Sequence, residues 1–400
     1  SPDFLLCRCE QKVESAVRKK LSLFCQVPES HVISMHDVKN TYHVPLLMWQ
    51  QKLDELLSKR LGLKEIIDKK TPEEMPNLHK LIRWKLFVDK INSLDENVTI
   101  GLVGKYTGLS DSYMSVMKAL QHACIDADLD LSIEWIESSD LEPATRATNP
   151  ARYDSAWDRL KSVNGVLVPG GFGDRGIEGK VCAARYCRQN NMPFLGICIG
   201  LQMAVIEFAR TELGWEDANS TEFNENSENP VVINMPEISS THMGGTMRLG
   251  SRVTIIKDQN SLASKIHEGQ PVIYERHRHR YEVNPANIAE YERRGLLFTG
   301  QDDRAQRMEI AELKDHPYFL CVQYHPEFKS RPMNPARTFL SFVLAAAGKL
   351  EKRFAEGGGV LKVNGVHLTP KDLETDIEIY RSELTKSLAG QATLHPSASA

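Results

Sequence analysis

A cysteine set between two glycines is the residue of this chain whose surroundings most favour covalent chemistry. Cys198 follows the apolar run at 193–197, Gly196 and Gly200 stand close on either side, and a helical pattern of apolar residues begins directly afterwards. This is the Gly-x-nucleophile-x-Gly elbow with cysteine in the place of serine. The glycines leave room for the sharp turn, and the positive end of the following helix favours the reactive thiolate. The alternative is a buried cysteine that packs as a small hydrophobic residue.

A histidine and a glutamate downstream could supply the base that a cysteine nucleophile needs. His325 follows an apolar run at 319–322, and Pro326 separates it from Glu327. We expect an extended backbone here, because proline favours an extended residue before it, and an extended backbone turns residues two apart to the same side. Glu327 would then fix the imidazole tautomer and leave the other ring nitrogen facing the thiol. A surface loop with two polar residues is the alternative.

A glycine-rich turn supplies candidate donors for an oxyanion. The apolar run at 166–168 predicts a buried strand, and Gly170 and Gly171 follow it. Backbone N–H groups in such a turn, together with that of Ile199 after the nucleophile, can approach a developing negative charge. Most glycine-rich turns are only turns. Here, however, the nucleophile, the base and the turn each follow a predicted strand.

These three segments resemble the class I glutamine amidotransferases. Further strings resemble the CTP synthases within that family, namely residues 168–179, 195–202, 219–223, 243–250 and 275–284. The resemblance covers roughly residues 1–348. It implies a Cys-His-Glu triad of Cys198, His325 and Glu327, which releases ammonia from the side-chain amide of glutamine through a glutamyl thioester.

The resemblance also implies a glutamine pocket. Its residues would be Gly171, Ile199, Gly200, Leu201, Gln202, Glu222 and Arg280. Gln202, Glu222 and Arg280 would hold the ammonium and carboxylate groups of the substrate, since arginine binds a carboxylate through two parallel hydrogen bonds. The alternatives are an exposed loop carboxylate at Glu222 and a solvated, phosphate-attracting patch at 276–280. Strand alternation would place Arg276, Arg278 and Arg280 on one side.

For nucleotides the resemblance implies only part of a site. Lys20, Asp37 and Val38 match positions of the UTP and ATP site. Phe172 and Arg175 would contact GTP, which activates that family. ATP and Mg²⁺ are expected for the full enzyme, with no covalently bound cofactor and no metal site in this chain. Gly104 and Lys105 follow a predicted strand, but their loop is too short to wrap a phosphate.

The order of predicted elements indicates an α/β protein of four parts. We expect the end of a P-loop-type amidoligase (synthase) domain at 1–44, a helical connector at 45–96, the amidotransferase domain at 97–348 and a mobile tail at 349–400. From residue 98 onward strands alternate with helices, a rhythm typical of a mostly parallel, flavodoxin-like sheet flanked by helices. Sites in such folds lie beyond the carboxyl ends of the strands. Residues 219–250 read as a long functional loop, and residues 371–386 as one charged helix of the tail.

The composition is that of an ordinary soluble protein. A net charge of −4 over 400 residues argues against nucleic acid as the main partner. No apolar run reaches membrane-spanning length. Eight cysteines at irregular spacings favour reduced thiols and a cytoplasmic location.

The interpretation that joins these observations is ATP-dependent amination of UTP to CTP with ammonia taken from L-glutamine. The chain begins without methionine, near the expected end of a synthase domain, so we expect it alone to hydrolyse glutamine at best. Homo-tetramers or filaments would follow if a synthase domain is present. The alternatives are the glutaminase of another class I amidotransferase, such as a GMP synthetase, a stand-alone γ-glutamyl hydrolase, and a non-catalytic assembly or regulatory form.

Overall fold

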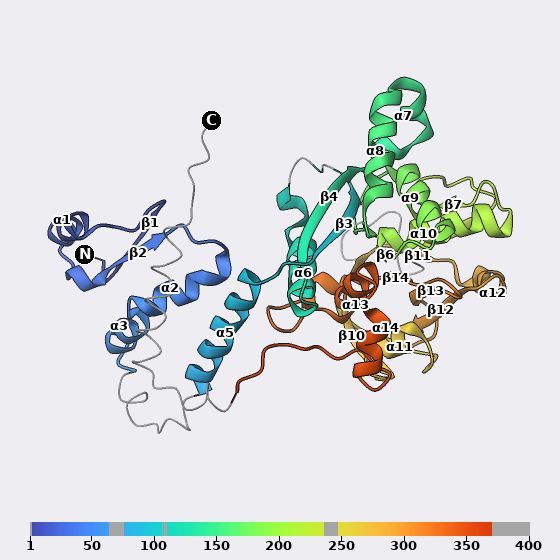
Figure 1. The fold of residues 1–400 in the computed structure, drawn as a ribbon. Coiled ribbons are helices and arrows are strands. Elements are labelled where there is room, and N and C mark those ends of the chain that lie inside the picture. The colour runs from blue at the N-terminus through green and yellow to red at the C-terminus, as the bar shows by residue number, and fades with distance from the viewer. Residues whose placement is uncertain (1, 64–75, 106, 108–109, 236–246, 370–400) are drawn as a thin grey trace. The chain divides into compact units, whose positions relative to one another are not determined.

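The computed structural model describes residues 2–63, 76–105, 107, 110–235 and 247–369. The chain divides into two compact units. The first comprises the described residues up to 93 together with 366–369, and the second the described residues of 94–365 (Figure 1).

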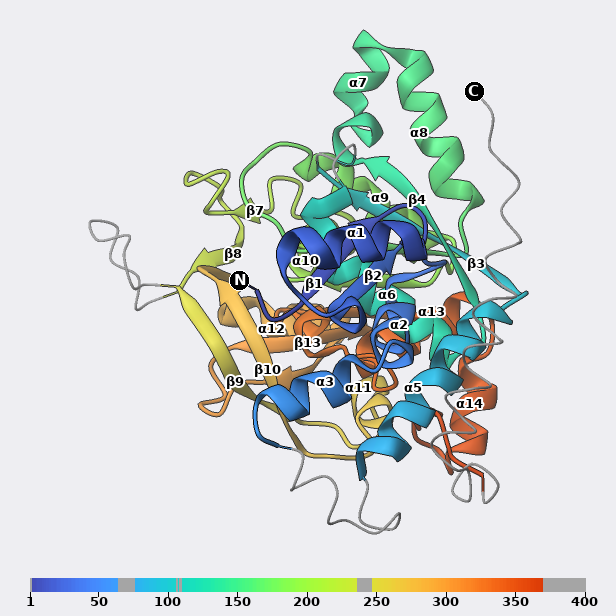
Figure 2. The same cartoon turned by 90° about the vertical axis from the view of Figure 1, so that its left-hand side faces the viewer.

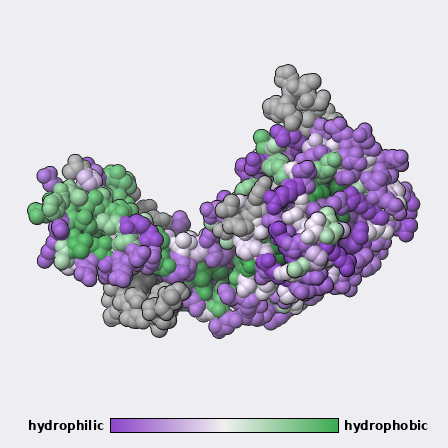
Figure 3. Space-filling model, turned by 90° about the horizontal axis from the view of Figure 1, so that it is seen from above, coloured by the Kyte–Doolittle hydropathy of each residue, from purple (hydrophilic) through white to green (hydrophobic). Residues whose placement is uncertain are grey.

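The N-terminal unit is a small α/β element followed by helices. Its two strands pair in parallel, and α1 connects them. The elements are β1 (Leu5–Cys9), α1 (Ser15–Cys25), β2 (Val32–His36), α2 (Val44–Gln50), α3 (Leu53–Arg60) and α5 (Pro76–Asn92), with 3-10 turns at Glu29–His31 and Thr41–His43. No residue of α1 is buried. Leu23 and Phe24 of α1 are 77% and 75% exposed. Hydrophobic surface, green in Figure 3, is visible on this unit.

A nine-stranded mixed sheet forms the centre of the second unit, in the order β10-β9-β12-β13-β14-β6-β5-β3-β4. Five strands pair in parallel, as the alternation of strands and helices predicts. They are β3 (Asn97–Gly104), β4 (Asp130–Glu137), β5 (Gly165–Val168), β6 (Phe194–Ile197) and β14 (Phe319–Val322). The other four extend the sheet in antiparallel pairing and are β9 (Arg248–Ile256), β10 (Val272–His279), β12 (Leu296–Gln301) and β13 (Met308–Leu313). Figure 2 shows β9 and β10 side by side at one edge.

Helices cover both faces of the parallel strands, which is why these strands are apolar throughout. Val166 and Val168 of β5 pack with α9 and α10, whereas Leu167 packs with α6 and α13. The helices are α6 (Met114–Asp126), α7 (Pro143–Thr148), α8 (Pro150–Ser162), α9 (Ile177–Gln189), α10 (Ile199–Phe208), α11 (Leu262–Ile266), α12 (Ile288–Arg293), α13 (Arg337–Ala346) and α14 (Leu350–Glu356). Short 3-10 turns lie at Ser110–Tyr113, Ser138–Leu141, Pro285–Asn287 and Pro326–Lys329, and a π turn at Ala209–Leu213. The predicted class of sheet flanked by helices is confirmed.

Two strands of a second, three-stranded sheet lie within residues 219–250, the segment that we expected to be a long loop. Its strands are β7 (Asn219–Ser220), β8 (Pro230–Asn234) and β11 (Tyr281–Val283), in the order β11-β8-β7. The loop prediction is wrong here because Val231 and Val232 are fully buried, together with Val283, in the core beside α10. Two apolar residues in a polar stretch are a weak signal for so short a strand.

The structure differs from the expected mobile tail for residues 350–365. Phe354 of α14 and Leu361 are buried, and the Arg353 guanidinium donates to Asp126 Oδ1 at 2.9 Å. The Gly365 N–H donates to Asp126 Oδ2 at 2.8 Å. This segment therefore packs as part of the second unit. The predicted helix at 371–386 lies outside the described residues.

Candidate active site

Cys198 occupies a strained elbow between β6 and α10. Its φ of 54° and ψ of −102° are rare for a residue with a side chain. A Cβ at Gly200 would lie 2.3 Å from the carbonyl oxygen of Val168, so α10 can begin this close to β5 only with glycine there. The Cys198 N–H donates to the Val322 carbonyl at 2.7 Å. The predicted pair of glycines thus meets a steric need, and the strain lies at the proposed nucleophile.

His325 and Glu327 are buried and joined by a hydrogen bond of 2.8 Å between Nδ1 and Oε1. The expected extended backbone is wrong. Residues 326–329 form a 3-10 turn, and His325 before it has φ −111° and ψ 85°. Pro326 fits the first position of that turn because its φ is already fixed. The turn brings the Glu327 carboxylate back to the imidazole, so the pair forms by another route than the one we expected.

The histidine and the cysteine both lie against Gly170. A Cβ on that glycine would lie 2.5 Å from His325 Cε1 and 3.5 Å from Cys198 Cβ. Burial alone would lower the pKa of His325, but its interactions with Cys198 and Glu327 raise the pKa to about 10. A raised pKa of this kind is typical of an imidazole whose protonated form is stabilised by hydrogen-bonding partners and nearby negative charge. The sequence prediction singled out Gly171 and missed the steric role of Gly170.

Two lysines that sequence reasoning did not assign to the site lie beside the glycine-rich turn. Lys105 Nζ donates to the carbonyls of Phe172 and Gly173, at 2.9 and 2.8 Å. Burial lowers the pKa of Lys180 to about 8, with the charge of Lys105 adding to the effect. A Cβ on Gly171 would lie 3.9 Å from Lys180 Nζ. Lys105 was visible in the sequence only as part of an imperfect phosphate loop.

The proposed activator residues lie on the surface beside this turn. Phe172 is 51% exposed, and the Arg278 guanidinium lies 5.3 Å from the centre of its ring. Arg175 Nη2 lies 3.0 Å from Oε1 of Glu137. These residues are therefore placed where a ligand on the turn could reach them.

Apart from Gly171 in the glycine-rich turn, the proposed glutamine-binding residues come from three segments. Gln202 on α10 is buried, and its Nε2 donates to the Tyr281 carbonyl at 3.1 Å. Burial raises the pKa of Glu222, while the charges of Lys105 and Arg280 lower it. Arg280 lies between β10 and β11, and its buried Nε has no hydrogen-bond partner among the described residues. Ile199, Gly200 and Leu201 form the buried first turn of α10.

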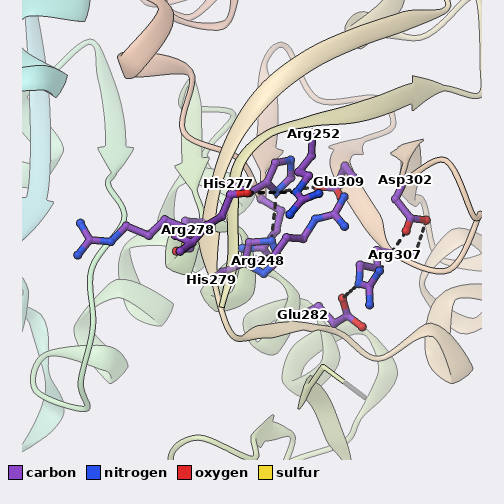
Figure 4. Close-up of polar contacts among 12 residues, drawn as sticks. Arg248, Arg252, His277, Arg278, His279, Glu282, Asp302, Arg307 and Glu309 are labelled. Atoms are coloured by element: carbon purple, nitrogen blue, oxygen red, sulfur yellow. Dashed lines mark hydrogen bonds and ion pairs between the residues drawn. The ribbon is translucent and has the colours of Figure 1, made fainter. Parts of the chain in front are cut away.

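The expected alternation is present within β10, but Arg280 lies beyond the end of this strand and does not continue it. In β10, Arg276 and Arg278 are exposed on one side, whereas His277 and His279 point into the protein (Figure 4). The main chain of this strand reaches the proposed triad. The His325 N–H donates to the Arg276 carbonyl at 2.8 Å, and Cys198 Sγ lies 4.0 Å from the Arg278 carbonyl.

The remaining predicted residues belong to the N-terminal unit. Lys20 is exposed on α1, and Asp37 pairs with Arg8 at 2.5 Å. Val38 follows it and is partly buried. Within the described part of the chain, no group of three or more His, Cys, Asp or Glu side chains could hold a metal ion. No helix in that part is long and apolar enough to cross a membrane.

Comparison with known proteins identifies both units. Residues 109–345 match the family model for class I glutamine amidotransferases, and residues 1–63 match that for the CTP synthase N-terminus. The chain is 48% identical to CTP synthase 2 of Xenopus laevis over 89% of its own length and 60% of the relative's. It is 46% identical to human CTP synthase 1 over 94% of its own length and 61% of the relative's. The chain thus spans about three fifths of these relatives.

A solved structure gives the same result. The glutaminase domain of the CTP synthase of Trypanosoma brucei, with bound acivicin, is 41% identical with a TM-score of 0.58. The similarity covers 63% of this chain and 94% of that one.

Proposed function

The chain belongs to the class I glutamine amidotransferases and, within them, to the CTP synthases, and on this premise we propose that it releases ammonia from L-glutamine for the amination of UTP to CTP. The observation that carries this proposal is the strained Cys198 elbow packed, with His325, against Gly170. The buried hydrogen bond from His325 to Glu327 completes the arrangement. A nucleophile, a base and an orienting carboxylate are the groups that acyl transfer requires.

In the first half of the reaction, the Cys198 thiolate attacks the amide carbon of glutamine. The carbonyl π electrons move to oxygen, where the backbone N–H groups of Gly171 and Ile199 would stabilise the negative charge. The tetrahedral intermediate then collapses, and the C–N bond breaks. His325, as the imidazolium, gives its proton to the departing nitrogen. The products are ammonia and a γ-glutamyl thioester on Cys198.

In the second half, water replaces ammonia. His325 is now neutral at the nitrogen that faces the substrate, so it accepts a proton from the water that attacks the thioester. The C–S bond breaks, glutamate leaves and the thiolate–imidazolium pair is restored. Glu327 keeps the ring in one orientation throughout, because its carboxylate accepts from Nδ1.

The selectivity for glutamine would come from two opposite charges. Glu222 and Arg280 interact electrostatically, and both are at least partly withdrawn from solvent. A free amino acid presents an ammonium and a carboxylate, so an acidic and a basic partner hold it without leaving a net charge buried. Gln202, already bound to the main chain at Tyr281, would shape the wall of this pocket.

The nucleotide part of the proposal rests on family membership. ATP, with Mg²⁺, would phosphorylate UTP, and ammonia would then displace the phosphate. Lys20, Asp37 and Val38 would border that site, and GTP would act at Phe172 and Arg175. The free thiols of all eight cysteines favour a reducing, cytoplasmic location. We also expect the active enzyme to be a homo-oligomer.

Glutamate release from glutamine tests the proposal directly. The full chain should release glutamate, GTP should raise the rate, and Cys198→Ala should abolish it. Cys25, a partly buried cysteine of α1, offers a control, and Cys25→Ala should keep the wild-type rate. Release that persists in Cys198→Ala would contradict the assignment. Absence of release in the wild type, even with GTP, would favour the assembly or regulatory form.

A further inference from the structure

We propose that His279, held by His277, is a positioning residue that fixes Arg280 for recognition of the substrate's α-carboxylate. The inference rests on the proposed glutaminase function and assigns a role to two histidines of the arginine-rich strand that the mechanism above does not use. Arg280 stands where the chain passes from β10, in the nine-stranded sheet, to β11, in the three-stranded sheet. No continuous ladder of backbone hydrogen bonds runs through this junction, so other contacts must fix the backbone at Arg280.

A chain of hydrogen bonds, formed by His277, His279 and the Tyr281 carbonyl, crosses that junction. His277 Nδ1 lies 3.1 Å from His279 Nε2, and His279 Nδ1 lies 3.0 Å from the Tyr281 carbonyl oxygen. The two imidazoles are 3% exposed and lie side by side on the inner face of β10 (Figure 4). The second hydrogen bond spans Arg280, because it joins the residue before it to the residue after it.

The Tyr281 carbonyl determines which ring nitrogen of each histidine carries the hydrogen. The Tyr281 oxygen can only accept, so Nδ1 of His279 carries the hydrogen. Burial lowers the pKa of His279 to about 3, so the ring is neutral and its Nε2 accepts. Nδ1 of His277 must then be the donor to it. Each ring therefore has one tautomer, and the hydrogen bonds are donated in one direction, from His277 to His279 to the Tyr281 carbonyl.

The buried ion pair of Arg248 and Glu309 lies at the other end of this chain of hydrogen bonds, beside His277. His277 Nδ1 lies 3.5 Å from Glu309 Oε2, and Arg248 Nη2 lies 3.0 Å from Glu309 Oε1. Glu309 is on β13, and Arg248 is on β9 directly opposite His279 in the strand register. Glu309 and Arg248 thus connect this chain of hydrogen bonds to two further strands of the large sheet, β13 and β9.

The backbone around Arg280 receives two further hydrogen bonds. The Tyr281 carbonyl also accepts from Gln202 Nε2 at 3.1 Å, and the Arg280 carbonyl accepts from the Met235 N–H at 3.1 Å. Without the His279 donor, Gln202 alone would hold the Tyr281 carbonyl. The Arg280 side chain would then start from a less defined position, and a bidentate contact with a carboxylate depends on that position.

Binding measured in a Cys198→Ala background of the full chain separates this role from a general structural one. We would compare L-glutamine with 4-aminobutanamide, which keeps the amine and the amide but lacks the α-carboxylate. His279→Leu should weaken glutamine binding about tenfold and leave 4-aminobutanamide binding unchanged. His279→Asn should restore most of the affinity, since its Nδ2 takes the place of the Nδ1 donor. In an Arg280→Ala background, His279→Leu should have no further effect.

His267→Leu is the matched control, because His267 is as deeply buried and its Nε2 has no hydrogen-bond partner in the described part of the chain. It should change neither affinity. Equal weakening of both ligands by His279→Leu, or no weakening, would overturn the inference. If Cys198→Ala binds glutamine but the wild type releases no glutamate, only the proposed hydrolysis fails. If no glutamine binds, both proposals fail.

Discussion

The Glu327 carboxylate accepts a hydrogen bond from His325 Nδ1 at 2.8 Å across a 3-10 turn in which only Pro326 stands between the two residues. The turn closes the pair by local backbone geometry, so its orientation does not depend on a distant segment. The imidazole is also buried against Gly170 and Cys198. A charged ring in such a place requires partners of opposite charge.

The first prediction concerns the protonation of His325. Its pKa of about 10 depends on Cys198 as well as Glu327, so Cys198→Ala should lower it by at least about one unit. The pKa is raised in the folded state, so the stabilisation by the protonated ring is complete below the unfolded value of about 6.5. That stabilisation is lost as the pH rises through about 10, and in Cys198→Ala it should be lost at lower pH. ¹⁵N NMR titration of His325 measures the change, and an unaltered titration would show that the thiol does not contribute.

The second prediction uses the close packing at Gly170. Gly170→Ala places a methyl group 2.5 Å from His325 Cε1, so the ring must rotate or move away from Cys198. We expect glutamate release to fall at least about a hundredfold, because small displacements of a catalytic group have large effects. Gly171→Ala is the comparison, since its methyl group meets nothing closer than 3.9 Å and its N–H is retained. Similar losses in both variants would argue against a specific clash with His325.

The third prediction is a pH dependence of substrate binding. Burial raises the pKa of Glu222, so this carboxylate becomes protonated at a higher pH than an exposed glutamate. The KM for glutamine should therefore rise as the pH is lowered towards 5, whereas in Glu222→Gln it should be high at every pH. Steady-state kinetics between pH 5 and 8 give both profiles. Parallel profiles for the two proteins would exclude Glu222 as the group that titrates.

Local signals in the sequence predicted the core of the site. The apolar run before Cys198 and the two glycines beside it are sufficient to specify β6, the elbow and α10, because each constraint acts within a few residues. Comparison with known proteins confirmed the family that these segments resemble, and the structure confirmed the fold class. The pairing of His325 with Glu327 was expected from their spacing, although the backbone between them was not.

Contacts between distant segments could not be read in this way. Lys105 binds the carbonyls at Phe172 and Gly173, 67 and 68 positions further along the chain. No pattern in either segment shows that they meet. Burial of His277 and His279 follows from strand alternation, but their hydrogen-bonded order depends on which strand lies opposite. The packing of 350–365 escaped prediction because its glycines and sparse apolar residues resemble those of a tail.

The fourth prediction concerns that segment. Arg353 and Asp126 form a buried ion pair of 2.9 Å between α14 and the end of α6. Arg353→Met removes the positive charge and leaves the Asp126 carboxylate buried, so the second unit should lose about 3 kcal/mol of stability. Chemical denaturation followed by tryptophan fluorescence measures the loss.

Lys352→Met is the matched control, because Lys352 is 81% exposed and lies 3.9 Å from Glu356, also exposed, on the same helix. Such a surface pair contributes between zero and about 1 kcal/mol. A chain that ends at residue 349 should be less stable than Arg353→Met, since it also exposes the core that Phe354 and Leu361 cover. If Arg353→Met and Lys352→Met unfold at the same denaturant concentration, α14 does not stabilise the unit through Asp126.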